Sequence, residues 1–142
     1  MKVRELMTAR VVAVSPDATI VQAAAKMRDE QVGSVLVVYN DKLVGMVTDR
    51  QITHTTVAAG DDPSIVRVRD IMFEDFIPLD PEMDVLKAMQ LQRELGMRRL
   101  PVVENGRPIG IVSVSDIAMF VKEFIDCVLQ EGSIRVMRRE RE

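Results

Sequence analysis

Two short motifs carry residue types that can bind a small polar ligand. Gly45-Met46-Val47-Thr48 is followed by Gln51, and Gly110-Ile111-Val112-Ser113 is followed by Asp116. A hydroxyl and a carboxylate or amide three residues apart can close the first turn of a helix, because their oxygen atoms accept backbone N–H groups. The same oxygen atoms can bind the hydroxyl groups of a ligand. From these residues alone, the capping and ligand-binding roles both stay open.

Arginines near these motifs are candidates for binding an anion. Arg98 and Arg99 precede an apolar run, and Arg50 lies inside the first motif. A guanidinium group binds phosphate strongly, but a solvated surface charge is the alternative for each of the three. For the pair Arg98 and Arg99 we expect one solvated charge and one phosphate contact.

The other reactive residues do not form a catalytic or metal-binding pattern. The chain has one histidine, His54, and one cysteine, Cys127. His54 lies among threonines and is expected at the surface, whereas Cys127 lies in an apolar helix face and is expected to be buried. No Gly-rich phosphate loop and no Ser/His/Asp set is present. We therefore expect a protein that is not an enzyme, requires no cofactor and holds no metal.

Composition and charge argue against two further classes of protein. The formal net charge is −3 and aromatic residues make up 4% of the chain. Neither a field that attracts nucleic acid nor a platform for base stacking is therefore expected. No stretch approaches the roughly 18 apolar residues that a membrane span needs. We expect a soluble, cytoplasmic protein whose partners are neither membranes nor nucleic acid.

The two motifs belong to an internal repeat of 65 residues. When residues 3–52 are aligned without a gap on residues 68–117, 12 of the 50 pairs are identical. Average residue usage would give roughly three or four identities. We therefore expect two repeats, residues 1–64 and residues 65–131, connected by the breaker-rich stretch 58–63.

Each repeat predicts the order strand, helix, strand, strand, helix. The first strands are expected at residues 11–14 and 76–79. The helices that follow are expected to begin at Ser15-Pro16-Asp17 and Asp80-Pro81-Glu82, where an acceptor side chain precedes proline. The fold class is therefore α/β, of the α+β type, with two β-α-β-β-α repeats.

Two hairpins are expected at the centre of the repeats. Asn40-Asp41 and Asn105-Gly106 are turn sequences that each separate two apolar, β-branched runs. A second helix is expected after each hairpin, from about Asp49 and from about Ser115.

The duplicated arrangement resembles a pair of cystathionine-β-synthase (CBS) domains, also called a Bateman module. Each repeat has the Gly-apolar-apolar-Thr/Ser motif at the end of its hairpin, and Met97-Arg98-Arg99-Leu100-Pro101-Val102-Val103 is similar to the family's strand entry. The resemblance covers about residues 1–125. It implies a regulatory protein in which the repeats pack as a pseudo-twofold pair and leave two clefts.

The resemblance also implies an adenosine nucleotide as the ligand: AMP, ADP or ATP, or else NAD or S-adenosylmethionine. In one cleft, the Asp116 carboxylate would accept hydrogen bonds from the ribose hydroxyls, and Ser113 would support the ribose or a phosphate. The other residues implied for this stronger cleft are Phe76, Ile77, Arg98, Arg99, Leu100 and Pro101.

The second cleft is expected to bind more weakly. Gln51 stands where the family motif has aspartate, so the charge-assisted hydrogen bond to ribose is lost. The strand entry Val32-Gly33-Ser34-Val35-Leu36 also lacks the arginines and proline of the second repeat. The residues implied for this weaker cleft are Thr48, Gln51, Arg50, Val12, Gly33, Ser34 and Val35.

The last helix continues past the repeat with an apolar stripe. Its residues recur at steps of three and four and are Ile117, Phe120, Val121, Phe124 and Val128. Because modules of this family usually dimerise through helices, we expect the stripe in a homodimer interface, with packing inside the chain as the alternative. Residues 132–142 mix arginine and glutamate, which predicts a mobile, solvated tail.

The function predicted from the sequence is ligand sensing. A nucleotide would bind between the repeats, shift their arrangement and so signal to an effector protein. Three alternatives remain: an adaptor that binds partners without nucleotide, a DNA-linked regulator acting through the arginine-rich tail, and a nucleotide-processing enzyme.

Overall fold

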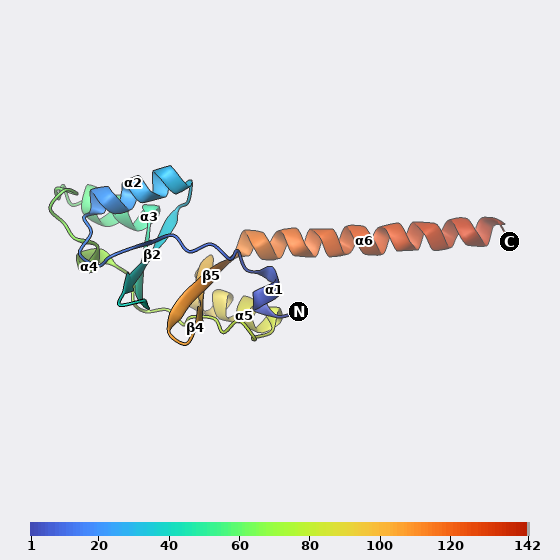
Figure 1. The fold of residues 1–142 in the computed structure, drawn as a ribbon. Coiled ribbons are helices and arrows are strands. Elements are labelled where there is room, and N and C mark those ends of the chain that lie inside the picture. The colour runs from blue at the N-terminus through green and yellow to red at the C-terminus, as the bar shows by residue number, and fades with distance from the viewer. Residues whose placement is uncertain (142) are drawn as a thin grey trace.

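The computed structural model describes the backbone of residues 1–141 and the side chains of residues 1–131. Two lobes of strands and helices lie side by side, and one long helix projects from them (Figure 1). The elements are α1 (Val3–Leu6), β1 (Ala13–Val14), α2 (Ile20–Glu30), β2 (Ser34–Tyr39), β3 (Lys42–Thr48), α3 (Asp49–Ile52), the π-helical turn η1 (Thr53–Val57), α4 (Val68–Ile71), α5 (Val85–Leu95), β4 (Arg99–Glu104), β5 (Arg107–Ser113) and α6 (Val114–Arg141).

The two hairpins are built alike, which confirms the predicted duplication. β1, β2 and β3 form one sheet, and β4 and β5 form a second. Both hairpins shift register at equivalent positions, Val37/Val38 and Val102/Val103. Their turns are Asn40-Asp41 and Asn105-Gly106, in which all four residues have φ between 50° and 79°. Such left-handed pairs match the twist of the flanking strands.

The first strand of each repeat is shorter than predicted. β1 covers only Ala13–Val14 and pairs in parallel with β2. In the second repeat, the prediction of a strand over 76–79 is wrong, because only Leu79 pairs with β4. The Leu79 N–H donates to the carbonyl of Pro101 at 2.8 Å, and its carbonyl accepts from the N–H of Val103 at 2.9 Å.

Both helices α2 and α5 begin about four residues later than predicted. The Ser15 hydroxyl accepts the Asp17 N–H at 3.1 Å, and the Asp80 carboxylate accepts the Glu82 N–H at 2.8 Å, so these acceptors close turns and do not cap helices. The caps are Thr19, which forms a capping box with Gln22, and Asp84, which accepts the Leu86 N–H at 2.9 Å.

α6 begins at Val114, close to the predicted start. Cys127 on this helix is exposed, so the prediction that it is buried is wrong. The backbone of α6 continues to Arg141, through most of the segment predicted as a tail. The side chains of residues 132–142, on which the mobility and nucleic-acid predictions depend, lie outside the described residues.

Each hydrophobic core includes a short helix that belongs, in sequence, to the other repeat. This helix is α4 in the first core and α1 in the second. Val3 of α1 is fully buried in the second core, with Leu79, Leu100 and Val112. Val68 of α4 is fully buried in the first core. In Figure 1, the blue α1 accordingly lies by α5 and β5, and the green α4 lies near α2.

Hydrogen bonds and ion pairs hold α1 in the second lobe. The Val3 N–H donates to the Met83 carbonyl at 2.8 Å. The Glu82 carboxylate accepts from Lys2 Nζ at 2.5 Å and from Arg4 Nε at 3.1 Å, and Arg4 Nη2 also contacts Glu104 at 2.6 Å. α4 is held similarly, since the Val68 N–H donates to the Ala18 carbonyl and Arg69 pairs with Asp17.

Removing the apolar side chain that α1 buries tests this arrangement. We expect Val3→Ala to lower the free energy of unfolding by about 2 kcal/mol, because it leaves a cavity in the second core. Val11→Ala, at a side chain that is 40% exposed, is the matched control and should cost less than about 0.5 kcal/mol. Equal effects in urea unfolding would show that α1 does not complete the core.

The ion-pair cluster around α1, formed by Lys2, Arg4, Glu82 and Glu104, predicts that the stability of the fold depends on pH. The hydrogen bond from Lys2, and to a smaller extent the one from Arg4, holds the pKa of Glu82 below its usual range. A depressed carboxyl pKa stabilises the fold above the unfolded pKa, and this stabilisation is lost as the pH falls through the folded value. Between about pH 7 and about pH 4, Glu82→Gln should therefore lose less stability than the wild type.

The change should be small, because the Glu82 side chain is 53% exposed. Glu94→Gln, at an exposed carboxylate of α5 outside this cluster, is the control and should follow the wild-type pH profile. If Glu82→Gln and Glu94→Gln give the same profile, the α1 cluster contributes nothing to acid sensitivity.

Candidate functional site

A cleft of about 250 Å³ lies between the two repeats and contains Asp116 and Ser113. The segment between α1 and β1, the entry to β2, the start of β4 and the junction of β5 with α6 all contribute to it. Its lining residues are Thr8, Arg10, Val12, Gln31, Val32, Gly33, Ser34, Arg99, Ile111, Ser113 and Asp116. Residues of both repeats therefore face the same space.

Asp116 and Ser113 form a reciprocal cap at the start of α6. The Ser113 N–H donates to Asp116 Oδ2 at 2.9 Å, and the Asp116 N–H donates to Ser113 Oγ at 3.1 Å. Both residues are half-buried and both line the cleft. The capping role is thus observed. It fixes the orientation of the carboxylate but does not involve Oδ1.

Two arginines line the cleft. Arg99 at the start of β4 approaches the backbone of Gly33, where an added Cβ atom would lie 3.6 Å from its Nη1 and 3.1 Å from Asp49 Oδ2. Arg10 is paired with the Glu30 carboxylate, and its Nη2 also donates to the Glu30 carbonyl at 3.1 Å. Guanidinium groups in this position can bind phosphate groups.

The structure regroups the residues predicted for the two clefts. Asp116, Ser113 and Arg99 of the predicted stronger set share one cleft with three residues of the predicted weaker set. Those three residues are Val12, Gly33 and Ser34. The cause is the connecting segment, residues 8–12, which runs from α1 in the second lobe to β1 in the first and so brings Val12 to Asp116.

The other residues of the predicted stronger set lie elsewhere. Leu100 and Pro101 are buried on β4, and Phe76 packs against the second core. Ile77 is 50% exposed, and Arg98 lines a different groove, on the helical face of the second lobe. None of these five residues lines the cleft that contains Asp116.

The motif of the first repeat, which was predicted to form the more weakly binding cleft, makes contacts within the protein. Thr48 Oγ1 accepts the Gln51 N–H at 3.1 Å, and the Gln51 side-chain amide donates to the carbonyl of Ile71, the last residue of α4. Arg50 is exposed, and Val35 is fully buried in the first core. The Gln51 amide is therefore committed to holding α4.

Arg10 and Thr8 were not predicted from the sequence. Their repeat equivalents are Asp75 and Phe73, so comparison of the two repeats gives no signal for a polar or cationic function there. The available signal was a lone arginine just before the first strand, which has no specificity by itself.

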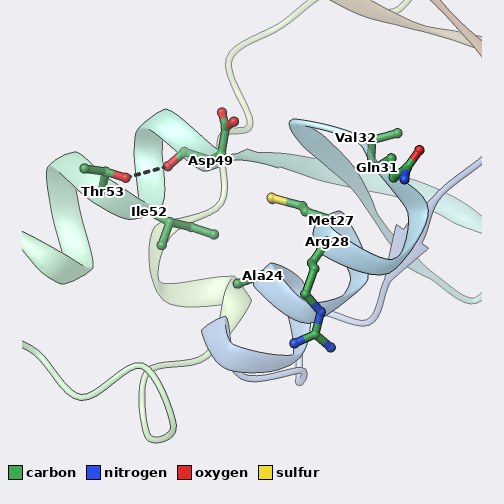
Figure 2. A pocket seen from close by; sticks show the side chains of 8 residues that line it. All are labelled: Ala24, Met27, Arg28, Gln31, Val32, Asp49, Ile52 and Thr53. Atoms are coloured by element: carbon green, nitrogen blue, oxygen red, sulfur yellow. Dashed lines mark hydrogen bonds between the residues drawn. The ribbon is translucent and has the colours of Figure 1, made fainter.

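A larger cavity, of about 380 Å³, lies outside this cleft, between α2 and α3 (Figure 2). Met27, Ala24 and Ile52 face it, and Thr53 Oγ1 donates to the Asp49 carbonyl at its edge. A groove of about 290 Å³ occupies the equivalent place in the second lobe, next to Met89, Met97 and Ile117. Both lie on helical faces and lack the Asp116–Ser113 pair.

Among the residues whose side chains the structure describes, no group of three or more His, Cys, Asp or Glu residues is placed to hold a metal ion. No helix within the described residues is long and apolar enough to cross a membrane.

Comparison with known sequences identifies the family. The sequence profile of the CBS domain matches residues 3–56 and again residues 68–123. The chain belongs to the CBS domain family. It contains two CBS domains in tandem, and such pairs are regulatory modules.

Three relatives illustrate the similarity. The CBS domain-containing protein YhcV of Bacillus subtilis is 38% identical over 117 residues, 82% of this chain and 83% of YhcV. The crystal structure of Hypoxic Response Protein I with two coordinated zinc ions has a TM-score of 0.76 at 31% identity, covering 84% of this chain and 98% of that one.

The third relative is the CBS domain pair of protein MJ0100, solved in complex with 5-methylthioadenosine and S-adenosyl-L-methionine. Its TM-score is 0.78, over 87% of this chain and 97% of that one, at 20% identity. At this identity the comparison shows the common fold alone. The α+β fold of two paired repeats is thereby confirmed, although the first strand of the second repeat is reduced to the pairing of Leu79.

Proposed function

We propose that this CBS pair is a sensor that binds an adenosine nucleotide in the cleft between its repeats. The observation that carries the proposal is the meeting of Asp116 and Ser113 with Arg10 and Arg99 in one cleft lined by both repeats. The CBS pair of MJ0100, solved with 5-methylthioadenosine and S-adenosyl-L-methionine, supports the adenosine part of this ligand, whereas the phosphate part is argued from the two arginines.

The cleft offers a separate group for each part of a nucleotide. The Asp116 carboxylate accepts hydrogen bonds from two neighbouring ribose hydroxyls, and its cap with Ser113 holds it in place. Arg10 and Arg99 bind the phosphates, and the apolar side chains of Val12, Val32 and Ile111 line the cleft beside the base.

The connecting segment, residues 8–12, couples ligand binding to the arrangement of the repeats. Thr8 pairs with Ile111 in the second lobe, and the Val12 carbonyl accepts the Leu36 N–H at 2.9 Å in the first. A ligand held against this segment contacts both lobes at once. Its affinity therefore differs between arrangements of the two lobes, and binding shifts their populations.

We also propose that two copies of the chain associate as a homodimer and that an effector protein reads their arrangement. Without a nucleotide ligand, the same surfaces would serve a partner-binding adaptor. The experiment below separates these two functions.

Nucleotide binding is tested by thermal unfolding with AMP, ADP, ATP, NAD and S-adenosylmethionine. A ligand at about 100 times its Kd adds about 2.7 kcal/mol, which raises the Tm by several degrees. We expect such a rise with at least one of them, and a loss of about tenfold or more in its affinity with Asp116→Asn, because the charged acceptor is removed.

Asp126→Asn, at an exposed carboxylate of α6 away from the cleft, is the matched control and should bind as the wild type does. The Tm of unliganded Asp116→Asn shows separately whether the cap of α6 is intact. If none of the five compounds raises the wild-type Tm, the sensor proposal is wrong and the adaptor function is favoured.

The ion pair of Arg10 with Glu30 predicts competition for the phosphate. Glu30→Gln removes the negative charge that competes for Arg10 and keeps its hydrogen bond to the backbone carbonyl, so the affinity for the nucleotide should rise about two- to fivefold, within the range of exposed ion pairs. Arg10→Gln should lower this affinity, and neither change should alter the binding of adenosine, which has no phosphate.

Calorimetric titration with the nucleotide and with adenosine measures these differences. Asp29→Asn, which removes the ion pair with Arg28 on the same helix, is the control and should leave both affinities unchanged. Equal changes for nucleotide and adenosine would contradict a phosphate-binding role of Arg10.

A further inference from the structure

The Asp49 carboxylate lies close to the cleft that contains Asp116. An added Cβ atom on Gly33, a lining residue of that cleft, would lie 3.1 Å from Asp49 Oδ2 and 3.6 Å from Arg99 Nη1. The Asp49 N–H also donates to the Gly33 carbonyl at 2.9 Å, which holds the start of α3 beside Gly33. The acid and the arginine therefore lie on the same side of the Gly33 backbone, where an anion bound by Arg99 would meet both.

The negative charge of Asp49 is available to act on a ligand. Asp49 is exposed, and its Oδ1 accepts the neighbouring Arg50 N–H at 2.7 Å. The ion pairs between described side chains include none of Asp49, with Arg99 or with another residue. Figure 2 shows the carboxylate pointing away from Met27 and Ile52, so it does not fill the apolar part of the cavity between α2 and α3.

The charges around the cleft are balanced. Arg10 is paired with Glu30, and Arg99 lies near Asp49, so each guanidinium group has a carboxylate beside it. The Asp116 carboxylate lines the same cleft. These five side chains together carry no excess of positive charge, and such an excess is what attracts a ligand with several phosphate groups.

We propose that Asp49 is a specificity-determining residue, which makes the cleft prefer the monophosphate of adenosine to the triphosphate. Each added phosphate group increases the ligand charge that Asp49 repels, whereas the number of arginines in the cleft stays the same. The inference rests on the proposed binding of a nucleotide in this cleft, and it adds which nucleotide binds best.

The fold does not require an acid at this position. Val114 corresponds to Asp49 in the second repeat. Thr48 Oγ1 and Ser113 Oγ each accept the N–H of the third residue after them, at 3.1 Å, so the helices that follow are capped in the same way. Asp49→Asn keeps an oxygen atom for the Arg50 N–H and should therefore remove the charge without unfolding α3.

The test is a calorimetric titration with AMP, ADP and ATP in the absence of divalent cations, which would neutralise phosphate charge. We expect the affinity of the wild type to fall in this order, by at least about threefold from AMP to ATP. Asp49→Asn should raise the affinity for ATP about three- to tenfold and the affinity for AMP by about twofold or less, so the preference narrows. Adenosine, which has no phosphate, should bind equally to both proteins.

Asp61→Asn is the matched control. Asp61 is also an exposed carboxylate of the first repeat, but it lies in the connector 58–63, on the side of the first lobe away from the second (Figure 1). This variant should bind all four compounds as the wild type does. The wild-type preference should also narrow as the salt concentration rises, because ions screen the repulsion. The Tm of each unliganded variant shows separately whether the fold is intact.

A preference for AMP that narrows with Asp49→Asn but not with Asp61→Asn supports the inference. A wild type that binds ATP as tightly as AMP overturns it. So does an equal effect of Asp49→Asn on AMP and ATP, because the effect would then not depend on ligand charge. In both of these cases nucleotide binding itself stands. If none of the three nucleotides binds, the phosphate-binding part of the proposed function is wrong, and this inference falls with it.

Discussion

Completion of each hydrophobic core by a helix from the neighbouring repeat is the constraint on which the structure depends. Val3 is buried among residues of the second lobe, and Val68 is buried in the first. The chain must therefore cross between the lobes before β1 and again before Leu79. The first crossing, residues 8–12, forms one wall of the cleft with Asp116. The cleft therefore depends on the exchange of α1 and α4 between the two cores.

The pseudo-twofold arrangement makes two positions equivalent, but their chemistry differs. Asp116 corresponds to Gln51, Arg10 to Asp75 and Gly33 to Arg98. One side therefore has a carboxylate, a cation and a glycine. On the other side the amide is bonded to Ile71, an acid replaces the cation, and a long side chain replaces glycine. The two equivalent positions of the duplicated fold are therefore chemically different.

Local signals predicted the hairpins, because turn residues with left-handed backbone and alternating apolar residues act within a few positions. They misplaced the starts of α2 and α5, because Ser15 and Asp80 bond backbone N–H groups equally well in a turn or a helix cap. Asp116, Ser113 and Arg99, which line the cleft, were predicted as candidate ligand-binding residues. The grouping was not, because it depends on which lobe receives α1, a long-range packing choice that no local pattern encodes.

The placement of α1 also has a consequence for synthesis of the chain. The first core holds residues that all precede residue 73, so it can close while the remainder is still being translated. The second core requires Val3 together with Val112 and Ile117. Because α1 is synthesised before the other elements of this core, it is buried late, and its apolar side chains stay exposed while the two repeats are translated.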